Sequence, residues 1–329
     1  MGSSETILIG ALFPLSGRAA QLGRTGYQGA RLAAEEINEA GGVLGGPIEL
    51  RVADTRGPLG TVAEARAFVE QVRATALLGV VSSAAVLAVT DVARESKTVL
   101  MATIASTERA TTEKFHRYFF RSGVSNAQES RSAARVAAAL PHRRWYVIAP
   151  DYEYGYNSWT IFQAQLARFR PDMEVVGEAW PEFLEHDYGA YIEAILRAKP
   201  DAVYNLLYGG DLVAFTRQAR GTTLFERIPF LNAEMSYNGL RFLAAGLARA
   251  GTRDSDALVQ ALEGMTLELP RGPVTLRTED HQAILGMVWG RTRRDPDFAF
   301  SVLADLQVFE GAEITPPADE VLAARQRAA

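Results

Sequence analysis

The sequence contains no cysteine. Disulfides, thiolate metal sites and cysteine nucleophiles are therefore excluded. Lysine is almost absent as well, because only Lys97, Lys114 and Lys199 occur and arginine supplies the rest of the positive charge. No stretch approaches the roughly 18 consecutive apolar residues that a membrane-spanning helix needs. The chain must therefore fold without covalent cross-links.

The charge balance argues against a nucleic-acid partner. Asp and Glu number 39 against 34 Lys and Arg, which leaves a net charge of −5. Binding to phosphate backbones or anionic membranes needs clustered Lys and Arg. The length of 329 residues exceeds one ordinary core and suits two α/β lobes, and 48% hydrophobic residues is typical of a globular protein.

The first residues, Met1 to Ser4, are polar and lead directly into an apolar run. A signal peptide would show a charged segment followed by an apolar one. This start resembles the scar of a recombinant expression tag. We therefore expect an exported, periplasmic protein whose signal peptide has been removed.

Apolar runs alternate with amphipathic patterns along most of the chain. The runs that predict strands are residues 6–12, 48–53, 77–81, 98–102, 118–121, 145–149, 174–177, 202–207 and 229–232. The patterns that predict helices between them are residues 26–38, 61–73, 84–96, 126–140, 156–168, 188–197 and 210–220. Such alternation predicts an α/β fold with two doubly wound parallel sheets. We expect the break between them near residues 121–123.

Polar groups follow five of the predicted strands, at the sheet edge where open α/β proteins bind ligands. These groups are Ser82-Ser83, Ala105-Ser106-Thr107, Tyr154, Tyr208 and Glu234. Each has a structural alternative. The serine pair is either a helix N-cap or an anion site, and the two are compatible. Glu234 is either a solvated loop carboxylate or a partner for a ligand's ammonium group, and the tyrosines are either rim aromatics or ligand contacts.

Signals for catalysis are weak. The glycine-rich segment Gly41–Gly46 follows a helix and precedes a strand, which is the wrong order for a dinucleotide fingerprint. No phosphate-binding loop and no nucleophile elbow occur. The four histidines are dispersed, and the pair Asp280-His281 has no evident nucleophile. We expect no enzyme activity, no cofactor and no metal.

Three longer segments carry a family resemblance. They are Ile9–Gly17, Gly29–Asn38 followed by Gly41-Gly42, and Pro273–Arg277 followed by Asp280–Ala283. Together they resemble the type I periplasmic solute-binding proteins of ABC importers, of the leucine/isoleucine/valine-binding type. The similarity extends from about residue 6 to about residue 310. It implies two lobes joined by a hinge, with the ligand in the cleft between them.

The resemblance also implies roles for individual residues. Ser83, beside Ser82, would hold the ligand carboxylate. Ala105, through its carbonyl, and Thr107 would bridge ammonium and carboxylate. From the other lobe, Tyr208 and Glu234 would close over the amino group, and the further contacts would be Tyr154, Tyr237 and Leu22.

The sequence departs from the family between Glu234 and Tyr237. Relatives have roughly fifty more residues there, whereas this chain has only Met235 and Ser236. We expect the first lobe at residues 1–121 plus 236–288, and a shortened second lobe at 122–235 plus 289–329. The departure places the edge protection of the second lobe and its hinge in question.

The expected function is capture of a small amino acid with an apolar side chain, followed by delivery to an ABC permease. The alternatives are a receptor for an amide, urea or an aromatic acid, and a cytoplasmic ligand sensor of the same fold. Amides, urea and aromatic acids lack an ammonium group and would leave Glu234 without a purpose.

Overall fold

The first half of the chain forms a five-stranded parallel sheet. The computed structural model describes residues 5–17, 19–228, 230–231, 239–269, 272–294 and 301–328. The elements of this half are β1 (Ile7–Phe13), α1 (Ala20–Glu39), β2 (Ile48–Asp54), α2 (Gly57–Glu70), β3 (Ala76–Gly79), α3 (Ser83–Ser96), β4 (Val99–Ala102), the 3-10 turn η1 (Glu108–Ala110) and β5 (Phe119–Arg121). The strand order is β2-β1-β3-β4-β5, and all four pairings are parallel.

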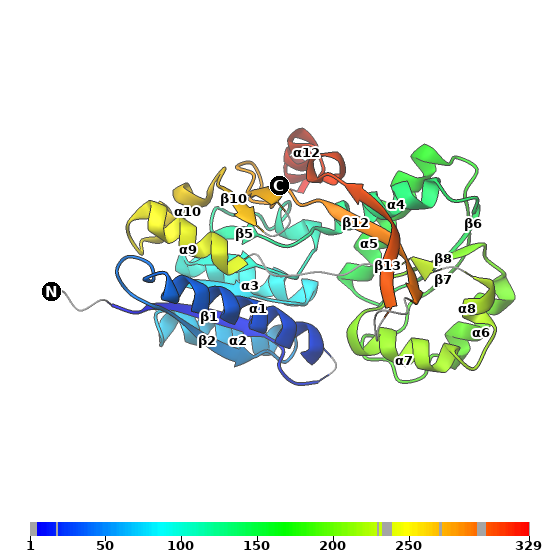
Figure 1. Ribbon diagram of the computed structural model, residues 1–329, viewed down its shortest axis with the longest axis horizontal. Helices are drawn as coiled ribbons and strands as arrows, with labels where there is room; N and C mark the ends of the chain where they lie inside the picture. Colours follow the sequence, from blue (N-terminus) through cyan, green and yellow to red (C-terminus); the bar gives the residue numbers. More distant parts are fainter. Residues whose placement is uncertain are drawn as a thin grey trace.

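A second parallel sheet follows, with the order β7-β6-β8-β9. Its elements are α4 (Asn126–Ala138), β6 (Arg144–Ile148), α5 (Glu153–Phe169), β7 (Glu174–Ala179), α6 (Gly189–Ala198), β8 (Ala202–Asn205), α7 (Gly209–Ala219), α8 (Leu224–Arg227) and β9 (Phe230–Leu231). The two sheets lie at opposite ends of the elongated molecule in Figure 1. This arrangement confirms the predicted α/β class with two doubly wound sheets.

The remaining elements return to both sheets. They are α9 (Gly239–Ala250), α10 (Ser255–Leu262), β10 (Thr266–Leu269), β11 (Gly272–Thr275), β12 (Met287–Arg294), β13 (Ser301–Phe309), α11 (Gly311–Ile314) and α12 (Ala318–Ala328). Helix α9 packs on α1, β3 and β4, whereas β12 packs on α4 (Figure 1). Strands β10 and β11 form one antiparallel pair and β12 and β13 another. The predicted lobe boundaries stay predictions.

Helix α1 begins six residues before its predicted start at Gly26, so that boundary is wrong. Glycine lowers helix propensity, and Gly23 and Gly26 both lie inside the observed helix. Packing overrides propensity here. A Cβ on Gly23 would lie 1.9 Å from the carbonyl oxygen of Pro14, and one on Gly26 would lie 2.8 Å from the ring of Phe13. The two glycines let α1 approach the end of β1 closely.

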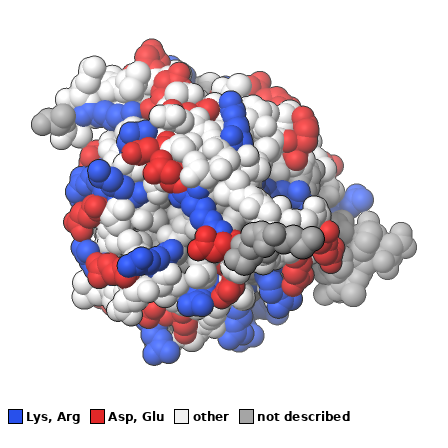
Figure 2. All heavy atoms as spheres, turned by 90° about the vertical axis from the view of Figure 1, so that its left-hand side faces the viewer, with Lys and Arg blue, Asp and Glu red and all other residues white. Residues whose placement is uncertain are grey.

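The surface carries charges of both signs. Figure 2 shows the face at the left-hand side of Figure 1, where acidic and basic side chains are interspersed. Pairs such as Arg31–Glu35 and Arg66–Glu95 are exposed and join opposite charges. Among the described residues, no helix is both long and apolar enough to cross a membrane.

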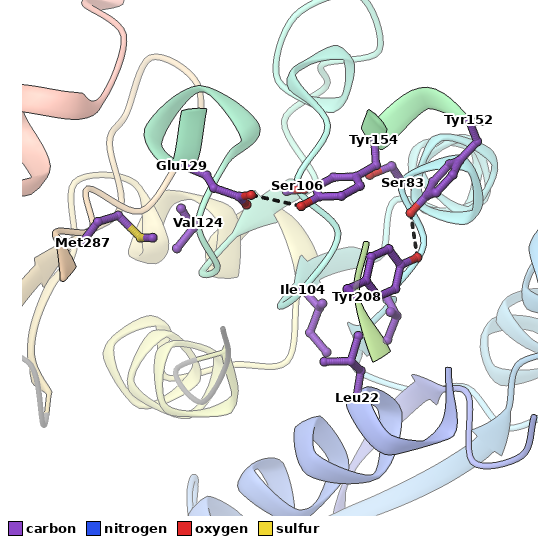
Figure 3. Close-up of a pocket in the computed structure, with 11 residues that line it drawn as sticks. Leu22, Ser83, Ile104, Ser106, Val124, Glu129, Tyr152, Tyr154, Tyr208 and Met287 are labelled. Atoms are coloured by element: carbon purple, nitrogen blue, oxygen red, sulfur yellow. Dashed lines mark hydrogen bonds between the residues drawn. The ribbon is translucent and has the colours of Figure 1, made fainter. Parts of the chain in front are cut away.

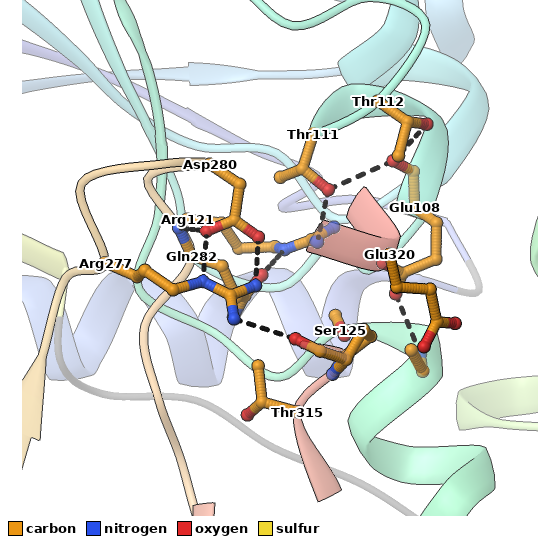
Figure 4. A network of polar contacts seen from close by, with 12 residues as sticks. Glu108, Thr111, Thr112, Arg121, Ser125, Arg277, Asp280, Gln282, Thr315 and Glu320 are labelled. Atoms are coloured by element: carbon orange, nitrogen blue, oxygen red, sulfur yellow. Dashed lines mark hydrogen bonds and ion pairs between the residues drawn. The ribbon is translucent and has the colours of Figure 1, made fainter. Parts of the chain in front are cut away.

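A buried polar network joins three segments that are far apart in sequence (Figure 4). Arg121, at the end of β5, is fully buried. Its guanidinium donates to the carbonyl oxygen of Thr107 at 2.7 Å and to the side chain of Gln282. The amide of Gln282 donates in turn to the carbonyl oxygen of Gly123 at 2.9 Å.

Helix α4 is anchored to the same network. Ser125 and Gln128 form a capping box at its start. The Gln128 amide donates to the carbonyl oxygen of Ala283 at 3.0 Å and to the Thr315 hydroxyl at 2.7 Å. The segments at residues 121–128, 280–284 and 311–316 are thereby fixed to one another, between the two sheets.

Replacing Arg121 with Met should lower the free energy of unfolding by about 2–6 kcal/mol, because the buried Thr107 carbonyl and Gln282 side chain lose their donor and each unsatisfied acceptor costs about 1–3 kcal/mol. Urea denaturation measures this loss. The matched control is Arg31→Met, which removes an exposed i,i+4 pair worth under about 1 kcal/mol. Equal losses in the two variants would contradict the structural role of Arg121.

Candidate functional site

A pocket lies where the carboxyl ends of the two sheets face each other (Figure 3). From the side of the first sheet it is lined by Leu22, Val81, Ser83, Ile104 and Ser106. From the other side it is lined by Val124, Glu129, Tyr152, Tyr154, Tyr208 and Met287. A larger hollow of about 500 Å³ adjoins it and shares Val81, Tyr152 and Tyr208 with it. The described part of this lining is mostly apolar, with hydroxyl groups and the carboxyl of Glu129.

One wall is the N-terminus of α3. The Ser82 side chain caps this helix and accepts a hydrogen bond from the backbone N–H of Ala85 at 3.4 Å. Ser83 is the first helical residue and is buried. Two residues with positive φ precede the cap, Gly79 at 118° and Val80 at 64°. A β-branched residue in this region is strained, and such strain gathers at functional sites.

The opposite wall presents three tyrosines. Tyr152 and Tyr208 are the N-cap residues of α5 and α7, and their hydroxyl oxygens lie 2.7 Å apart. Tyr154 donates its hydroxyl to Glu129 at 3.0 Å. Burial raises the pKa of all three tyrosines above its usual value. They are therefore neutral hydroxyl groups at physiological pH.

Among the described residues, Glu129 is the one that brings a carboxyl to the pocket lining. It lies in the first turn of α4 and is 8% exposed. Burial raises the pKa of Glu129 to about 7, and the hydrogen bond from Tyr154 opposes this rise. Near neutral pH the side chain is therefore divided between its charged and uncharged forms.

The structure brings together Leu22, Ser83, Tyr154 and Tyr208 of the predicted residues. Ser82 lines the adjoining hollow. Glu234 and Tyr237 lie outside the described residues. The predicted ligand roles of all these residues stay predictions.

Ala105 and Thr107 line neither hollow. The backbone N–H of Ala105 donates to the carbonyl oxygen of Val80 at 3.0 Å. The Thr107 hydroxyl donates across the cleft to Glu153 of α5 at 2.8 Å, and Arg109 lies 3.4 Å from the same carboxylate. In this structure the Thr107 hydroxyl therefore joins the two walls.

The pair Asp280-His281 is held by structural contacts. Asp280 accepts two hydrogen bonds from Arg277, at 2.8 and 2.5 Å. The ring of His281 stacks on Phe120 with 4.0 Å between centroids, and one ring nitrogen lies 2.8 Å from the carbonyl oxygen of Phe119. These contacts occupy both side chains.

The sequence interpretation missed Glu129 and Tyr152. Tyr152 closely follows the predicted strand 145–149, as the predicted site residues follow theirs, whereas Glu129 lies farther beyond the predicted strand 118–121. Tyr152 stands two positions before Tyr154, and Glu129 lies inside a predicted helix. A carboxylate in a helix is usually solvated, so the pattern alone gave no reason to turn it inward.

Replacing Glu129 with Gln should change stability in a pH-dependent way. Because the folded protein favours the protonated carboxyl, this contribution is fully present below the ordinary pKa of 4.5. It is lost as the pH rises through about 7. As the pH is raised from about 5 to about 8, the free energy of unfolding of the variant relative to that of the natural chain should therefore increase by on the order of 3 kcal/mol.

Urea unfolding of the variant and of the natural chain, at about pH 5 and about pH 8, measures this change in relative stability. The control is Glu193→Gln, since that side chain is 72% exposed and pairs with Arg197 in its own helix. A difference between Glu129→Gln and the natural chain that stays constant with pH would contradict the raised pKa.

Comparison with known proteins identifies the family of this chain. The family model described as "Periplasmic binding protein" matches residues 6–235 and 225–295. A protein of Pseudomonas aeruginosa named "Amino acid binding protein" is 30% identical over 206 residues, which cover 62% of this chain and 54% of that protein. The chain thus spans about half the length of this relative. The "Leucine-, isoleucine-, valine-, threonine-, and alanine-binding protein" of the same organism is 24% identical, with 82% and 85% covered.

Two solved structures share the fold. A solute-binding protein of an ABC transporter from Rhodopseudomonas palustris, in complex with 3,4-dihydroxybenzoic acid, has a TM-score of 0.87 at 18% identity, with 95% of this chain and 99% of that chain covered. The leucine-, isoleucine-, valine-, threonine- and alanine-binding protein of Brucella ovis, in a closed conformation, has a TM-score of 0.81 at 21% identity, with 96% and 98% covered. The family match, together with two parallel sheets facing each other across a pocket, shows that this chain belongs to the periplasmic binding protein family.

Proposed function

We propose that this protein is an extracytoplasmic receptor that captures a small amino acid with an apolar side chain and delivers it to an ABC permease. The main observation is the N-terminus of α3, which meets a pocket lined mainly by apolar side chains and tyrosines, together with the carboxyl of Glu129. Relatives named as amino-acid-binding proteins support the ligand class, and the family's name supports the location.

The α3 N-terminus suits the ligand's carboxylate. The first N–H groups of a helix have no partner within the helix, and the helix dipole places partial positive charge there. Ser83 adds a hydroxyl to these donors. Leu22, Ile104 and Met287 offer apolar surface for a side chain.

Capture requires the two lobes to close on the ligand by a hinge motion. We place the lobes at residues 1–121 plus 236–288 and at 122–235 plus 289–329, with Glu234 and Tyr237 as further contacts from the resemblance. Closure would exclude water and strengthen each charge-assisted hydrogen bond. No chemical step is needed, so the protein acts as a receptor and not as an enzyme.

An aromatic acid is the second candidate ligand. The pocket gathers Tyr152, Tyr154 and Tyr208, and Phe183 packs on Tyr208 with 5.8 Å between ring centroids. Such rings offer stacking surfaces for an aromatic ligand. Neighbouring structures with TM-scores of 0.87 and 0.84 were solved with 3,4-dihydroxybenzoic acid and p-hydroxybenzoic acid.

Isothermal titration calorimetry with a panel of ligands separates these candidates. The panel holds leucine, valine, alanine, 4-hydroxybenzoate, acetamide and urea. We expect heat of binding from at least one amino acid. Binding of 4-hydroxybenzoate alone would favour the second candidate, and no heat from any amino acid would reject the first.

The adjacent serines should respond differently to replacement. Ser83→Ala should weaken amino-acid binding by about 1.5–3 kcal/mol, which is the scale of a hydrogen bond to a charged group and corresponds to about tenfold to a hundredfold in Kd. Ser82→Ala should instead lower the free energy of unfolding by about 0.5–2 kcal/mol, because it removes the helix cap. Calorimetry and urea denaturation of both variants measure the two effects. Unchanged affinity in Ser83→Ala would remove this residue from the site.

A further inference from the structure

The proposed binding of the ligand's carboxylate at the α3 N-terminus gives no role to Glu129, although its side chain lines the same pocket. It lies in the pocket with Val124 and Met287 beside it, while Ser83, Tyr152 and Tyr208 lie on the other side in Figure 3. The side chain is 8% exposed, and Tyr154 donates its hydroxyl to one of its oxygens at 3.0 Å. A pocket-lining acid of this kind is costly to ionise without a positive partner.

The titratable groups that meet Glu129 from the described part of the chain are neutral tyrosines. Tyr154 of α5 donates a hydrogen bond to it, and Tyr204 of β8 is near enough for the charge of Glu129 to raise the pKa of the tyrosine. Strand β12 contributes Met287 to the pocket, and the indole of Trp289 donates to Ser132 of the same helix, α4.

Charged groups near α4 are engaged elsewhere. Arg131, on the same helix, pairs with Glu320 of α12 at 2.6 Å. Glu108 accepts the backbone N–H of Ala127 at 2.8 Å. Glu153 of α5 pairs with Arg109, which comes from the opposite wall of the cleft. Among the described residues, no lysine, arginine or histidine pairs with Glu129.

We propose that Glu129 contacts the ligand directly and receives its ammonium group, so that capture of a zwitterion releases a proton from the receptor. This inference rests on the proposed function. The ligand's carboxylate would face the α3 N-terminus and its ammonium would face Glu129, which supplies opposite charges at two sides of one small pocket. The O–H bond of the protonated carboxyl breaks, the proton passes to solvent, and no covalent bond to the ligand forms.

The chemistry distinguishes two kinds of ligand. An ammonium group favours the ionised carboxylate, so its binding draws the proton off. A phenolic hydroxyl donates a hydrogen bond without requiring a full charge on Glu129. Proton release is therefore expected when an amino acid binds, and it is not required when a hydroxybenzoate binds.

Calorimetric titration of the natural chain with leucine, between about pH 5.5 and 8.5, tests the inference. Because burial raises the pKa of Glu129 to about 7, the Kd should fall about tenfold from pH 6 to pH 8 and change little above that range. Titrations near pH 6 in phosphate and in imidazole, whose ionisation enthalpies differ, should show release of about one proton per ligand.

Three variants sharpen the test. Glu129→Gln should weaken leucine binding at pH 8 by about tenfold or more and abolish its pH dependence. Tyr154→Phe should move the midpoint of the pH dependence upward, because the hydroxyl that lowers the pKa of Glu129 is removed. Glu193→Gln, an exposed replacement of the same kind, should match the natural chain. Urea denaturation establishes that each variant is folded.

The outcomes separate this inference from the proposed function. Leucine binding with a pH-independent Kd and no proton release would overturn the role of Glu129 and leave the amino-acid receptor standing. Undiminished binding by Glu129→Gln at pH 8 would do the same. If neither leucine nor any other amino acid of the panel binds at any pH, both the proposed function and this inference fail.

Discussion

The fully buried guanidinium of Arg121 is the constraint on which the rest of the structure depends. A charge without water needs acceptors with correct geometry, and here they come from segments more than a hundred residues apart, including Thr107 and Gln282. The hydrogen bonds that Arg121 donates to Thr107 and Gln282 fix the end of the first sheet against the start of α4. Gln128 extends the same restraint to Thr315. The two sheets can present facing edges because the chain between them is held in this way.

The pocket is built from helix beginnings. Helices α3, α4, α5 and α7 each start where a strand or a short loop after it ends, and each brings a pocket residue in or beside its first turn: Ser83, Glu129, Tyr154 and Tyr208. The geometry unites helix N–H groups, neutral hydroxyls and one acid that titrates near neutral pH. Apolar residues fill the remaining wall. This combination is the basis for the proposed ligand, which carries both a carboxylate and a positive group.

The alternation of elements was largely predictable, because parallel strands buried on both faces appear in sequence as continuous apolar runs. Strands β3 and β4 are buried throughout. The start of α1 was not predictable, since glycine at Gly23 argues against a helix until its contact with Pro14 is known. The prediction of Ser83, Tyr154 and Tyr208 as site residues came from their places after strands, and the structure brings them to one pocket. The Thr107 hydroxyl showed no sequence sign of its partner Glu153, which lies 46 positions away.

The sequence by itself therefore determined the fold class and predicted the edge of each sheet at which a ligand would bind, because strand burial and strand ends leave local patterns. Only the tertiary structure decided which side chains meet. Burial of Glu129 depends on α4, α5 and β12 packing around it, and the loss of water there raises its pKa from 4.5 to about 7. Desolvation and contact are properties of groups brought together from distant positions, and no local pattern of residues records them.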